Sequence, residues 1–287
     1  MCYMTEPTDH RLSVCVLASG SKGNAIHVSD GETNVLFDAG LSGKEIQRRM
    51  DLRGLCFESL DAIVISHEHN DHIKGAGVLS RKLKIPVYIS ERTFLAAEPV
   101  MGKPHDLRAI DCGIPFRIDG LTIHPFSISH DAVDPSGFSI EKNGTKIGLA
   151  TDLGVANLVV REHLKFSNLL IIESNHDPVM LIENDNYPWP LKQRVKGRKG
   201  HLANEDTAAL LVELAHDNLH HVILAHLSEE NNSPDMALAS AVQALAGATA
   251  TLSVASQHEP GEVIHVSGAG CLGPQRFQNL SQKKQKA

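Results

Sequence analysis

The chain of 287 residues has few cysteines, few aromatic residues and no long hydrophobic run. Its five cysteines are scattered and never spaced as C-x-x-C, which argues against a disulfide framework or a cysteine-rich zinc site. Aromatic residues make up only 4% of the chain, so stacking on aromatic rings is not expected to be the main way of holding a ligand. No apolar run approaches the roughly 18 residues that a membrane-spanning helix needs, and no secretory signal is visible at the N-terminus. We therefore expect a cytoplasmic protein without a membrane partner.

Apart from its histidines, the composition is that of an ordinary globular protein. Hydrophobic residues make up 42% and charged residues 21% of the chain, and the net charge is −7. No linker or short-period repeat divides the sequence, so we expect one domain over residues 11–274 with short tails at 1–10 and 275–287. The 17 histidines are the unusual feature and direct attention to metal chemistry.

Predicted strands come first as hairpins and later alternate with helices. Strands are predicted for Leu12–Ala18, Ala25–Ser29, Thr33–Phe37, Asp61–Ser66, Pro86–Ser90, Leu169–Glu173, His221–Ala225, Thr251–Ala255 and Glu262–Val266, with a β-rich region over 116–151. Helices are predicted for Lys44–Met50, Gly75–Lys84, Asn204–His216 and Pro234–Leu245, with Asn204 as a helix cap. The segment Asn175–Gly200 is the most irregular. This order predicts two mixed sheets covered by helices in a layered α/β domain.

The strongest functional signal is an H-x-H-x-D-H motif directly after a predicted strand. It contains His67, His69, Asp71 and His72. Imidazole nitrogens and carboxylate oxygens suit Zn, Mn or Fe. Two histidines two positions apart on an extended segment can share one metal, while Asp71 and His72, past the turn, can reach a second. A solvated polar loop is the alternative, but ligand-type residues clustered so tightly at a strand end favour a metal site.

Further ligand candidates stand where later strands end. His130, Asp152 and His226 each follow a predicted strand. Strand ends along one sheet edge converge in space, so these residues can join the motif although they are distant in sequence. Each alone could be a surface polar residue; together with the motif they favour a second set of ligands. Glu173 also ends a strand and can hydrogen-bond a ligand histidine.

This succession of motif, lone histidine, aspartate in T-D-x-G and strand-ending histidine resembles the metallo-β-lactamase fold superfamily. The resemblance implies a four-layer αββα sandwich with a dinuclear site at one edge. It implies that one metal is bound by His67, His69 and His130, the other by Asp71, His72 and His226, with Asp152 bridging them. It also implies that Asp38, in Phe37-Asp38-Ala39-Gly40, orients the histidine-rich loop.

Three segments resemble the YycJ-like branch of this superfamily, bacterial cytosolic proteins related to ribonuclease Z and to phosphodiesterases. They are SGSKGN (Ser19–Asn24), KGHLAN (Lys199–Asn204) and LAHLSEENN (Leu224–Asn232). Antibiotic-hydrolysing members of the superfamily usually carry Cys where His72 stands, which disfavours that activity. The resemblance implies a nuclease, and within the branch a 5′-to-3′ exonuclease acting on DNA.

Two divalent ions at such a site, Zn or Mn with Fe as a further option, would lower the pKa of bound water from about 15.7 towards 7. A metal-bridging hydroxide would then be the nucleophile. The leaving alkoxide needs a proton, and His201 is the candidate donor because the matching family histidine contacts the scissile phosphate. We therefore predict catalytic roles for Asp71 and His201. A capping or surface role is the alternative for His201.

A run of basic residues leads into His201. It contains Lys192, Arg194, Lys196, Arg198 and Lys199. On an acidic chain this run is a local positive patch that phosphate groups could use, although a solvated loop is about as consistent with it. Nearby, Tyr187 and Trp189 could stack on bases, but their neighbouring prolines favour anchoring of the loop.

The sequence thus predicts two-metal hydrolysis of phosphodiester bonds in a nucleic acid, DNA or RNA. One alternative is a small-molecule hydrolase that acts on a cyclic phosphodiester or a thioester. Another is a non-catalytic, metal-stabilised binding module. A wide basic groove beside the metals would favour a polymer, whereas a closed pocket would favour a small ester.

Overall fold

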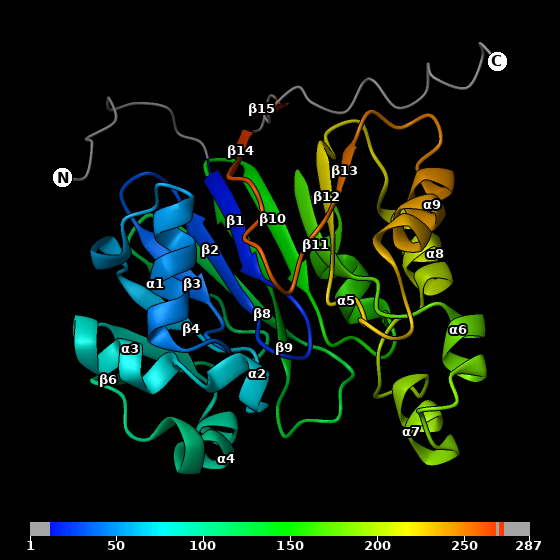
Figure 1. The fold of residues 1–287 in the computed structure, drawn as a ribbon. Helices are drawn as coiled ribbons and strands as arrows, with labels where there is room; N and C mark the ends of the chain where they lie inside the picture. The colour runs from blue at the N-terminus through cyan, green and yellow to red at the C-terminus, as the bar shows by residue number, and fades with distance from the viewer. Residues whose placement is uncertain (1–11, 268–269, 273–287) are drawn as a thin grey trace.

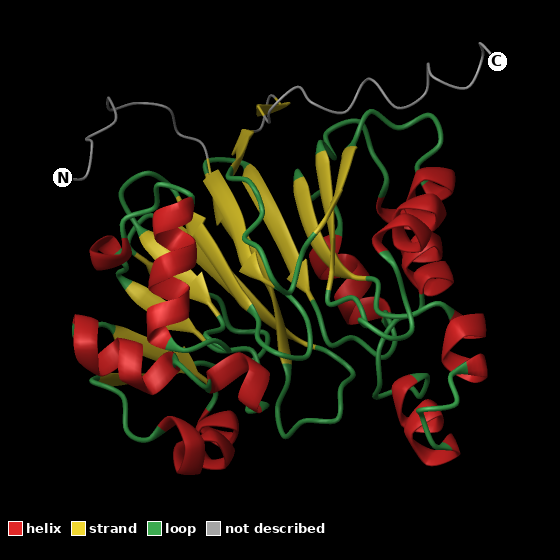
Figure 2. Ribbon diagram, viewed as in Figure 1, coloured by secondary structure: helices red, strands yellow, loops and turns green. Residues whose placement is uncertain are grey.

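Two β-sheets packed face to face, with helices on the outer face of each, organise the computed structural model (Figures 1 and 2). The structure describes residues 12–267 and 270–272, so the predicted tails at 1–10 and 275–287 lie outside the described residues. Within the described ranges, no helix is long and apolar enough to cross a membrane.

The first sheet has the strand order β15-β14-β1-β2-β3-β4-β5-β6. Its strands are β1 (Leu12–Ala18), β2 (Ala25–Ser29), β3 (Asn34–Phe37), β4 (Ala62–Val64), β5 (Pro86–Ile89), β6 (Asp106–Ala109), β14 (Ile264–Ser267) and β15 (Gly270–Leu272). Strands β3 to β6 are parallel. The associated helices are α1 (Gly43–Leu52), the 3₁₀ turn η1 (Phe57–Ser59), α2 (Asn70–Ile73), α3 (Ala76–Leu83) and α4 (Glu91–Met101).

The second sheet has the order β13-β12-β11-β10-β9-β8-β7. Its strands are β7 (Phe116–Ile118), β8 (Leu121–Ser127), β9 (Ser136–Lys142), β10 (Thr145–Ala150), β11 (Leu169–Glu173), β12 (His221–Ala225) and β13 (Thr251–Val254). Strands β10 to β13 are parallel. Helices α5 (Leu158–Leu164), α8 (Asn204–Leu214) and α9 (Pro234–Ala244) lie along this sheet, and α6 (Pro178–Glu183) and α7 (Trp189–Val195) lie near its lower edge in Figure 1.

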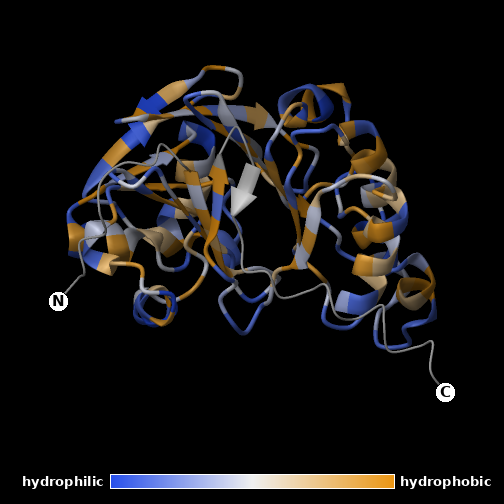
Figure 3. Ribbon diagram, turned by 90° about the horizontal axis from the view of Figure 1, so that it is seen from above, coloured by the Kyte–Doolittle hydropathy of each residue, from blue (hydrophilic) through white to orange (hydrophobic). Residues whose placement is uncertain are grey.

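The alternation of side chains along the strands explains the layers. In β11, Leu169 and Ile171 pack in the core between the two sheets, whereas Leu170 and Ile172 pack in the core beneath the helices. A strand that is apolar on both faces must be covered on both faces. Figure 3 shows the apolar strands between the two outer helical layers. The predicted αββα sandwich is therefore confirmed.

The parallel strands decide where the functional residues gather. Strands β3 and β4 of one sheet and β10, β11 and β12 of the other end at the same edge of the sandwich (Figure 1). Each predicted metal ligand lies in the segment that directly follows β4, β8, β10 or β12. The candidate site therefore lies where the carboxyl ends of strands from both sheets meet. Each sheet is covered by its own helical layer.

Some local predictions differ from the structure. Asn204 is the first residue of α8, and Ala203 occupies the cap position without a side-chain cap. The Asn204 side chain instead accepts a hydrogen bond from Ser174 Oγ at 2.7 Å and exchanges hydrogen bonds with Asn232. It therefore joins the loops that follow β11 and β12. The irregular segment Asn175–Gly200 contains the short helices α6 and α7.

Phe138 gives a direct test of the core between the sheets. Its ring is 1% exposed and lies 5.3 Å from the ring of Phe37, centroid to centroid, across the two sheets. We expect Phe138→Ala to lower the free energy of unfolding by about 3–5 kcal/mol, because it opens a cavity in this core. Urea unfolding of the metal-free protein measures the loss.

The matched control is Phe166→Ala, at a side chain that is 75% exposed. We expect this substitution to change the free energy of unfolding by no more than about 0.5 kcal/mol. Equal losses for the two variants would contradict the assignment of Phe138 to the core.

Candidate metal centre

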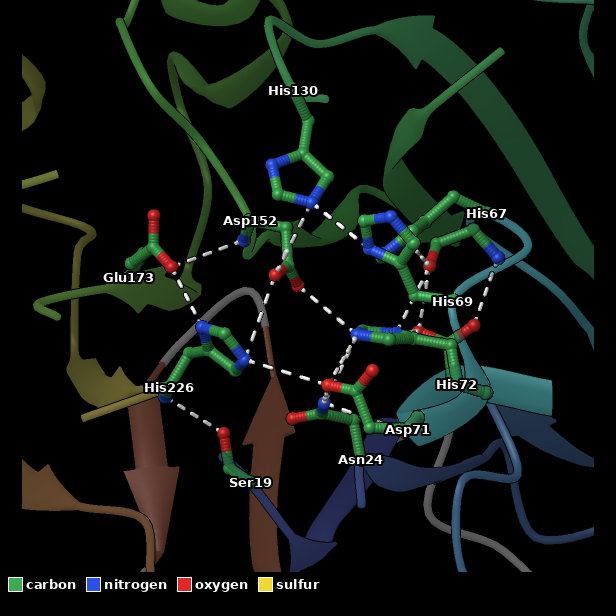
Figure 4. Close-up of polar contacts among 12 residues, drawn as sticks. Ser19, Asn24, His67, His69, Asp71, His72, His130, Asp152, Glu173 and His226 are labelled. Atoms are coloured by element: carbon green, nitrogen blue, oxygen red, sulfur yellow. Dashed lines mark hydrogen bonds and ion pairs between the residues drawn. The ribbon is translucent and has the colours of Figure 1, made fainter. Parts of the chain in front are cut away.

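The H-x-H-x-D-H motif spans two kinds of local structure (Figure 4). After β4 the chain continues without regular structure through Ser66 and His67, and His69, in an extended conformation, takes the cap position of the short helix α2. Asp71 and His72 lie on α2 itself. The first two histidines and the last two ligands therefore point to different parts of the centre.

Two neighbouring turns hold α2 against the first sheet. Asn24 N–H donates to the carbonyl of Asp71, and Ala39 N–H donates to the carbonyl of His72, both at 2.7 Å. A Cβ atom on Gly40 would lie 1.6 Å from the Asp71 carbonyl oxygen. Only glycine permits this approach of two backbones, so the Asp38-Ala39-Gly40 turn and the Ser19–Asn24 turn together place the ligands of α2.

Asp38 orients the histidine-rich loop through several contacts. Its carboxylate accepts hydrogen bonds from Ser66 N–H and Ser66 Oγ at 2.8 Å, and from His72 Nδ1 at 2.7 Å. Because Ser66 uses its only hydroxyl proton on Asp38, its oxygen accepts from His67 Nδ1 at 2.9 Å. Both histidines consequently turn their Nε2 atoms toward the centre. This contact is the one that the family resemblance implied for Asp38.

Two ligands that follow strands of the second sheet have a strained backbone conformation. Asp152 and His226 have φ values of 56° and 55°, a left-handed conformation that is costly for residues other than glycine. Glu173 accepts a hydrogen bond from Asp152 N–H at 3.2 Å, and Ser19 Oγ accepts one from His226 N–H at 2.8 Å. Such strain persists only where the surroundings enforce it. The fold therefore holds these two side chains in place at a cost in stability.

One group of inward-facing nitrogens has the spacing of a single metal site. His69 Nδ1 lies 3.0 Å from His67 Nε2 and 3.3 Å from His130 Nε2. Ligand nitrogens at about 2.0–2.1 Å from a tetrahedral ion are separated by about 3.3 Å. These three histidines therefore fit one divalent cation.

The second group consists of Asp71, His72 and His226. Asp71 Oδ2 lies 3.5 Å from His72 Nε2 and 3.9 Å from His226 Nε2. Between the groups stands Asp152, with Oδ2 at 3.2 Å from His72 Nε2 and Oδ1 at 3.7 Å from His130 Nε2. All seven predicted ligands thus lie together, and the Asp152 carboxylate reaches both groups.

Unsatisfied polar atoms show that this donor set fits metal ions. Asp152 Oδ2 and His226 Nε2 are buried without a hydrogen bond, which is costly unless a cation takes that place. His226 holds its other ring nitrogen, Nδ1, against Glu173 at 2.8 Å, and His130 holds Nδ1 near the Gly200 carbonyl at 3.3 Å. Histidines that bind metals are held in this way by their outer nitrogen.

The charges at the centre are balanced by protons in the metal-free protein. Burial and the nearby His72 lower the pKa of His67 well below its usual value, so it is a neutral ligand. Burial also acts to lower the pKa of His226, but Asp152, Asp71 and Glu173 outweigh it and raise that pKa to about 10. Asp38 and Asp152 likewise outweigh burial and raise the pKa of His72 well above its usual range. A metal must displace these protons.

Glu173 links the centre to His201. The Glu173 side chain is fully buried, and its Oε1 atom accepts hydrogen bonds from His226 Nδ1 at 2.8 Å and from His201 Nδ1 at 2.9 Å. The His201 ring centroid lies 5.2 Å from that of His226 and 5.3 Å from that of His130. His201 is partly exposed, with its Nδ1 atom 3.8 Å from Asp152 Oδ1. It therefore lies at the partly exposed side of the centre, close enough to Asp152, Glu173 and His226 to belong to the same cluster of ligand-type atoms.

Most of the basic run is exposed next to the centre. The exposed members are Arg194, Lys196, Arg198 and Lys199. The backbone of the run approaches the His130 loop, because Ser129 Oγ donates to the Arg198 carbonyl at 2.6 Å. Arg194 also pairs with Asp131 at 3.1 Å.

Lys192 corrects the prediction for this run. It is only 8% exposed, and its ammonium donates to the Ile182 carbonyl at 2.6 Å. Its position on the inner side of α7 turns it toward α6, so its charge is not available to a substrate.

Two polar contributors to the centre were not predicted as such. Asn24 Nδ2 lies 3.3 Å from Asp71 Oδ2 and 3.0 Å from His72 Nε2. Ser66 joins Asp38 to His67. The SGSKGN turn is the sequence signal for Asn24, although it does not show that the side chain reaches the centre. Nothing in the sequence around Ser66 distinguishes it from an ordinary strand-end serine.

Comparison with known proteins agrees with this geometry. A family model described as "Beta-lactamase superfamily domain" matches residues 33–227. The chain belongs to the β-lactamase superfamily, and its fold and centre are those of a metal-dependent hydrolase. Within the superfamily it falls in the YycJ-like branch, as its three segments predict.

The relatives that place it there cover most of the chain. It is 38% identical over 236 residues to the exodeoxyribonuclease YycJ of Bacillus anthracis, covering 82% of this chain and 89% of that protein. It is 36% identical over 237 residues to the exodeoxyribonuclease WalJ of Streptococcus pneumoniae, covering 81% and 88%. The crystal structure of the metallo-β-lactamase fold protein YhfI of Bacillus subtilis superposes with a TM-score of 0.68 at 17% identity, covering 88% and 99%. This last likeness shows the shared fold.

The raised pKa values of His72 and His226 predict how metal binding depends on pH. Both histidines hold a proton near pH 7, and the metal displaces it, so affinity rises as the pH rises through the neutral range. Calorimetric titration with Zn²⁺ in two buffers of different ionisation enthalpy measures the protons released. We expect His226→Gln to release fewer protons than the unmodified protein.

The control is His258→Gln, at an exposed histidine that pairs with Glu229. Its proton release should match that of the unmodified protein. Metal affinity that does not change with pH would contradict the charge balance described for the centre.

Proposed function

We propose that the chain is a cytoplasmic exodeoxyribonuclease that hydrolyses DNA from the 5′ end with two divalent metal ions, Zn or Mn, with Fe as a further option. The single observation that carries this proposal is the position of Asp152 between two separate groups of ligands, within reach of both. The relatives at 38% and 36% identity bear the name exodeoxyribonuclease, which supports the substrate and the mode of cleavage.

The residues divide between the two ions according to their spacing. His67, His69 and His130 would hold one ion, and Asp71, His72 and His226 the other, with Asp152 shared. Two bound divalent cations supply an activated water molecule and stabilise the negative charge that develops on the phosphoryl oxygens. Asn24 and Asp38 keep the ligands of α2 oriented toward this position.

His201 is placed to manage the proton of the leaving group. Its Nδ1 donates to Glu173, so Nε2 is the ring nitrogen left to meet a substrate. The Glu173 carboxylate fixes the orientation of the His201 ring, and a proton on His201 would be donated to the departing oxygen. A proton delivered there removes the need to release a free alkoxide.

The exposed cations favour a polymeric substrate over a small ester. Arg198 and Lys199 are exposed, directly before the Gly200 backbone that contacts His130. A strand that places one phosphate at the ions would lay its neighbouring phosphates across these side chains. A small cyclic phosphodiester has a single charge to place at the ions, and an uncharged thioester has none, so neither would use several cations outside the centre.

Loss of one metal ligand tests the catalytic proposal. The metal-depleted protein is reloaded with Zn²⁺ or Mn²⁺ separately and assayed on 5′-labelled and 3′-labelled DNA and RNA, single- and double-stranded. We expect release of labelled mononucleotide first from the 5′ end of DNA. We expect Asp71→Ala to lose turnover by orders of magnitude, because a ligand of the second ion is gone.

His201→Ala separates proton transfer from metal binding. This variant should keep its metal content and lose about 10²–10⁴-fold in kcat. Absence of cleavage under every metal loading would overturn the nuclease proposal and would favour the non-catalytic binding module.

Removing the charge of exposed cations tests whether the substrate is a polymer rather than a small ester. We expect the double variant Arg198→Gln with Lys199→Gln to raise KM for DNA. We also expect the slope of log affinity against log salt to fall by about 0.7 for each phosphate of a single strand that the protein no longer neutralises. The measurement is DNA binding and cleavage as a function of salt concentration.

The control for this experiment is Arg117→Gln with Lys165→Gln. Arg117 pairs with the start of β8, and Lys165 ends α5 just before β11, so both lie at the sheet edge opposite the centre. This double variant should leave the salt dependence of DNA binding unchanged. Equal behaviour of the two double variants would favour the small-molecule hydrolase.

A further inference from the structure

Trp189 is the only tryptophan in the chain, and its side chain is 56% exposed. The flanking prolines favour an anchoring role for it, but an anchor would be buried against the body of the protein. Exposing an indole ring to water has an unfavourable free energy that a bound partner can recover.

The segment that carries Trp189 is held firmly beside the centre. We call residues 178–199, which contain α6 and α7, the α6–α7 arm. Lys192 of α7 donates to the carbonyl of Ile182 in α6, so the two helices are tied together. His201 N–H donates to the carbonyl of Val195 at 2.8 Å, which ties the end of α7 to the candidate proton donor. Trp189 is therefore presented in a defined position relative to His201.

A cation accompanies the exposed ring. The Lys196 ammonium lies 5.6 Å from the centroid of the Trp189 ring, within the range of a cation–π contact. Because the ammonium lies over one face of the ring, a base would stack on the opposite face or displace the lysine, and in both cases its phosphate would lie within reach of the ammonium. An exposed aromatic ring with an adjacent cation is how proteins bind unpaired nucleic acid strands.

A cavity of about 270 Å³ continues from Lys196 to His201. Pro178, Leu181 and Ile182 contribute apolar side chains to its lining. Glu205 and Asp206 also line it, and their carboxylates disfavour a phosphate there. The cavity is therefore suited to an uncharged base or sugar.

We infer that the α6–α7 arm is a stacking platform for unpaired bases, with one base on Trp189, its phosphate at Lys196 and a neighbouring base or sugar in the cavity that leads to His201. The inference rests on the proposed function and narrows its substrate to DNA whose end is single-stranded. In a duplex, both faces of every internal base are already covered by its neighbours, so Trp189 favours an unpaired strand, in which base faces are free along the chain.

Because Trp189 is the only tryptophan, its intrinsic fluorescence reports on this contact directly. Metal-free protein in EDTA is titrated with a short oligothymidylate, with the matched abasic strand, and with the same sequence as a duplex. We expect strong quenching by the oligothymidylate and little by the abasic strand or the duplex. This measurement needs no cleavage, so it is independent of whether the nuclease proposal succeeds.

Three variants separate stacking from packing. We expect Trp189→Ala and Trp189→Leu to bind the oligothymidylate about tenfold more weakly, since stacking contributes about 1–3 kcal/mol per base. Trp189→Phe should recover most of the affinity. In the metal-loaded enzyme, Trp189→Ala should raise KM for single-stranded DNA by a larger factor than it lowers kcat.

Phe166→Ala, at another exposed aromatic residue that lies at the opposite sheet edge, is the control and should bind like the unmodified protein. Quenching by the abasic strand equal to that by the oligothymidylate would overturn the inference. So would full affinity in Trp189→Leu. Either result would leave the nuclease proposal standing if the unmodified protein cleaves DNA.

Discussion

The buried negative charge of Asp152 is the constraint around which the centre is arranged. Its carboxylate stands between His72, His130 and His226, with Glu173 fully buried behind the last of them. Two carboxylates so far from water are tolerated only where cations face them. Protons on His72 and His226 serve this purpose in the metal-free protein, and divalent ions would serve it in the working enzyme.

The αββα architecture makes this arrangement possible. Each sheet is covered by its own helices and fixed by its own core, so the facing strand ends are held rigidly. Asp38, Asp152 and His226 all occupy left-handed backbone where their strands end. Conformational strain at these positions is offset by the large apolar cores on either side, which gives a preorganised set of ligands.

In the function proposed above, the centre would carry out the chemistry and the α6–α7 arm would recognise the strand. The ligands lie in the interior, where low exposure strengthens every charge interaction. The arm lies outside, where exposed cations and a single indole ring can meet a flexible strand. His201 connects the two, because Glu173 holds its ring on one side and Val195 holds its backbone on the other.

Much of the fold and the centre could be predicted because the signals are local. Alternating apolar residues mark the strands, and the H-x-H-x-D-H motif lies within one short loop. Helix α2 was missed because its four residues form one turn that depends on contacts with Asn24 and Ala39. Helices α6 and α7 were missed because they are short and lie in a segment rich in proline and polar residues.

The sequence by itself determined the kinds of side chain, the strand alternation and the family, since each depends on neighbouring positions. Only the tertiary structure decided which charged and aromatic residues face the solvent. Lys192 turns inward to a carbonyl of α6, whereas Trp189 stays exposed on the same helix. The physical reason is that burial depends on which surfaces the chain brings together across long distances, and no local pattern encodes that.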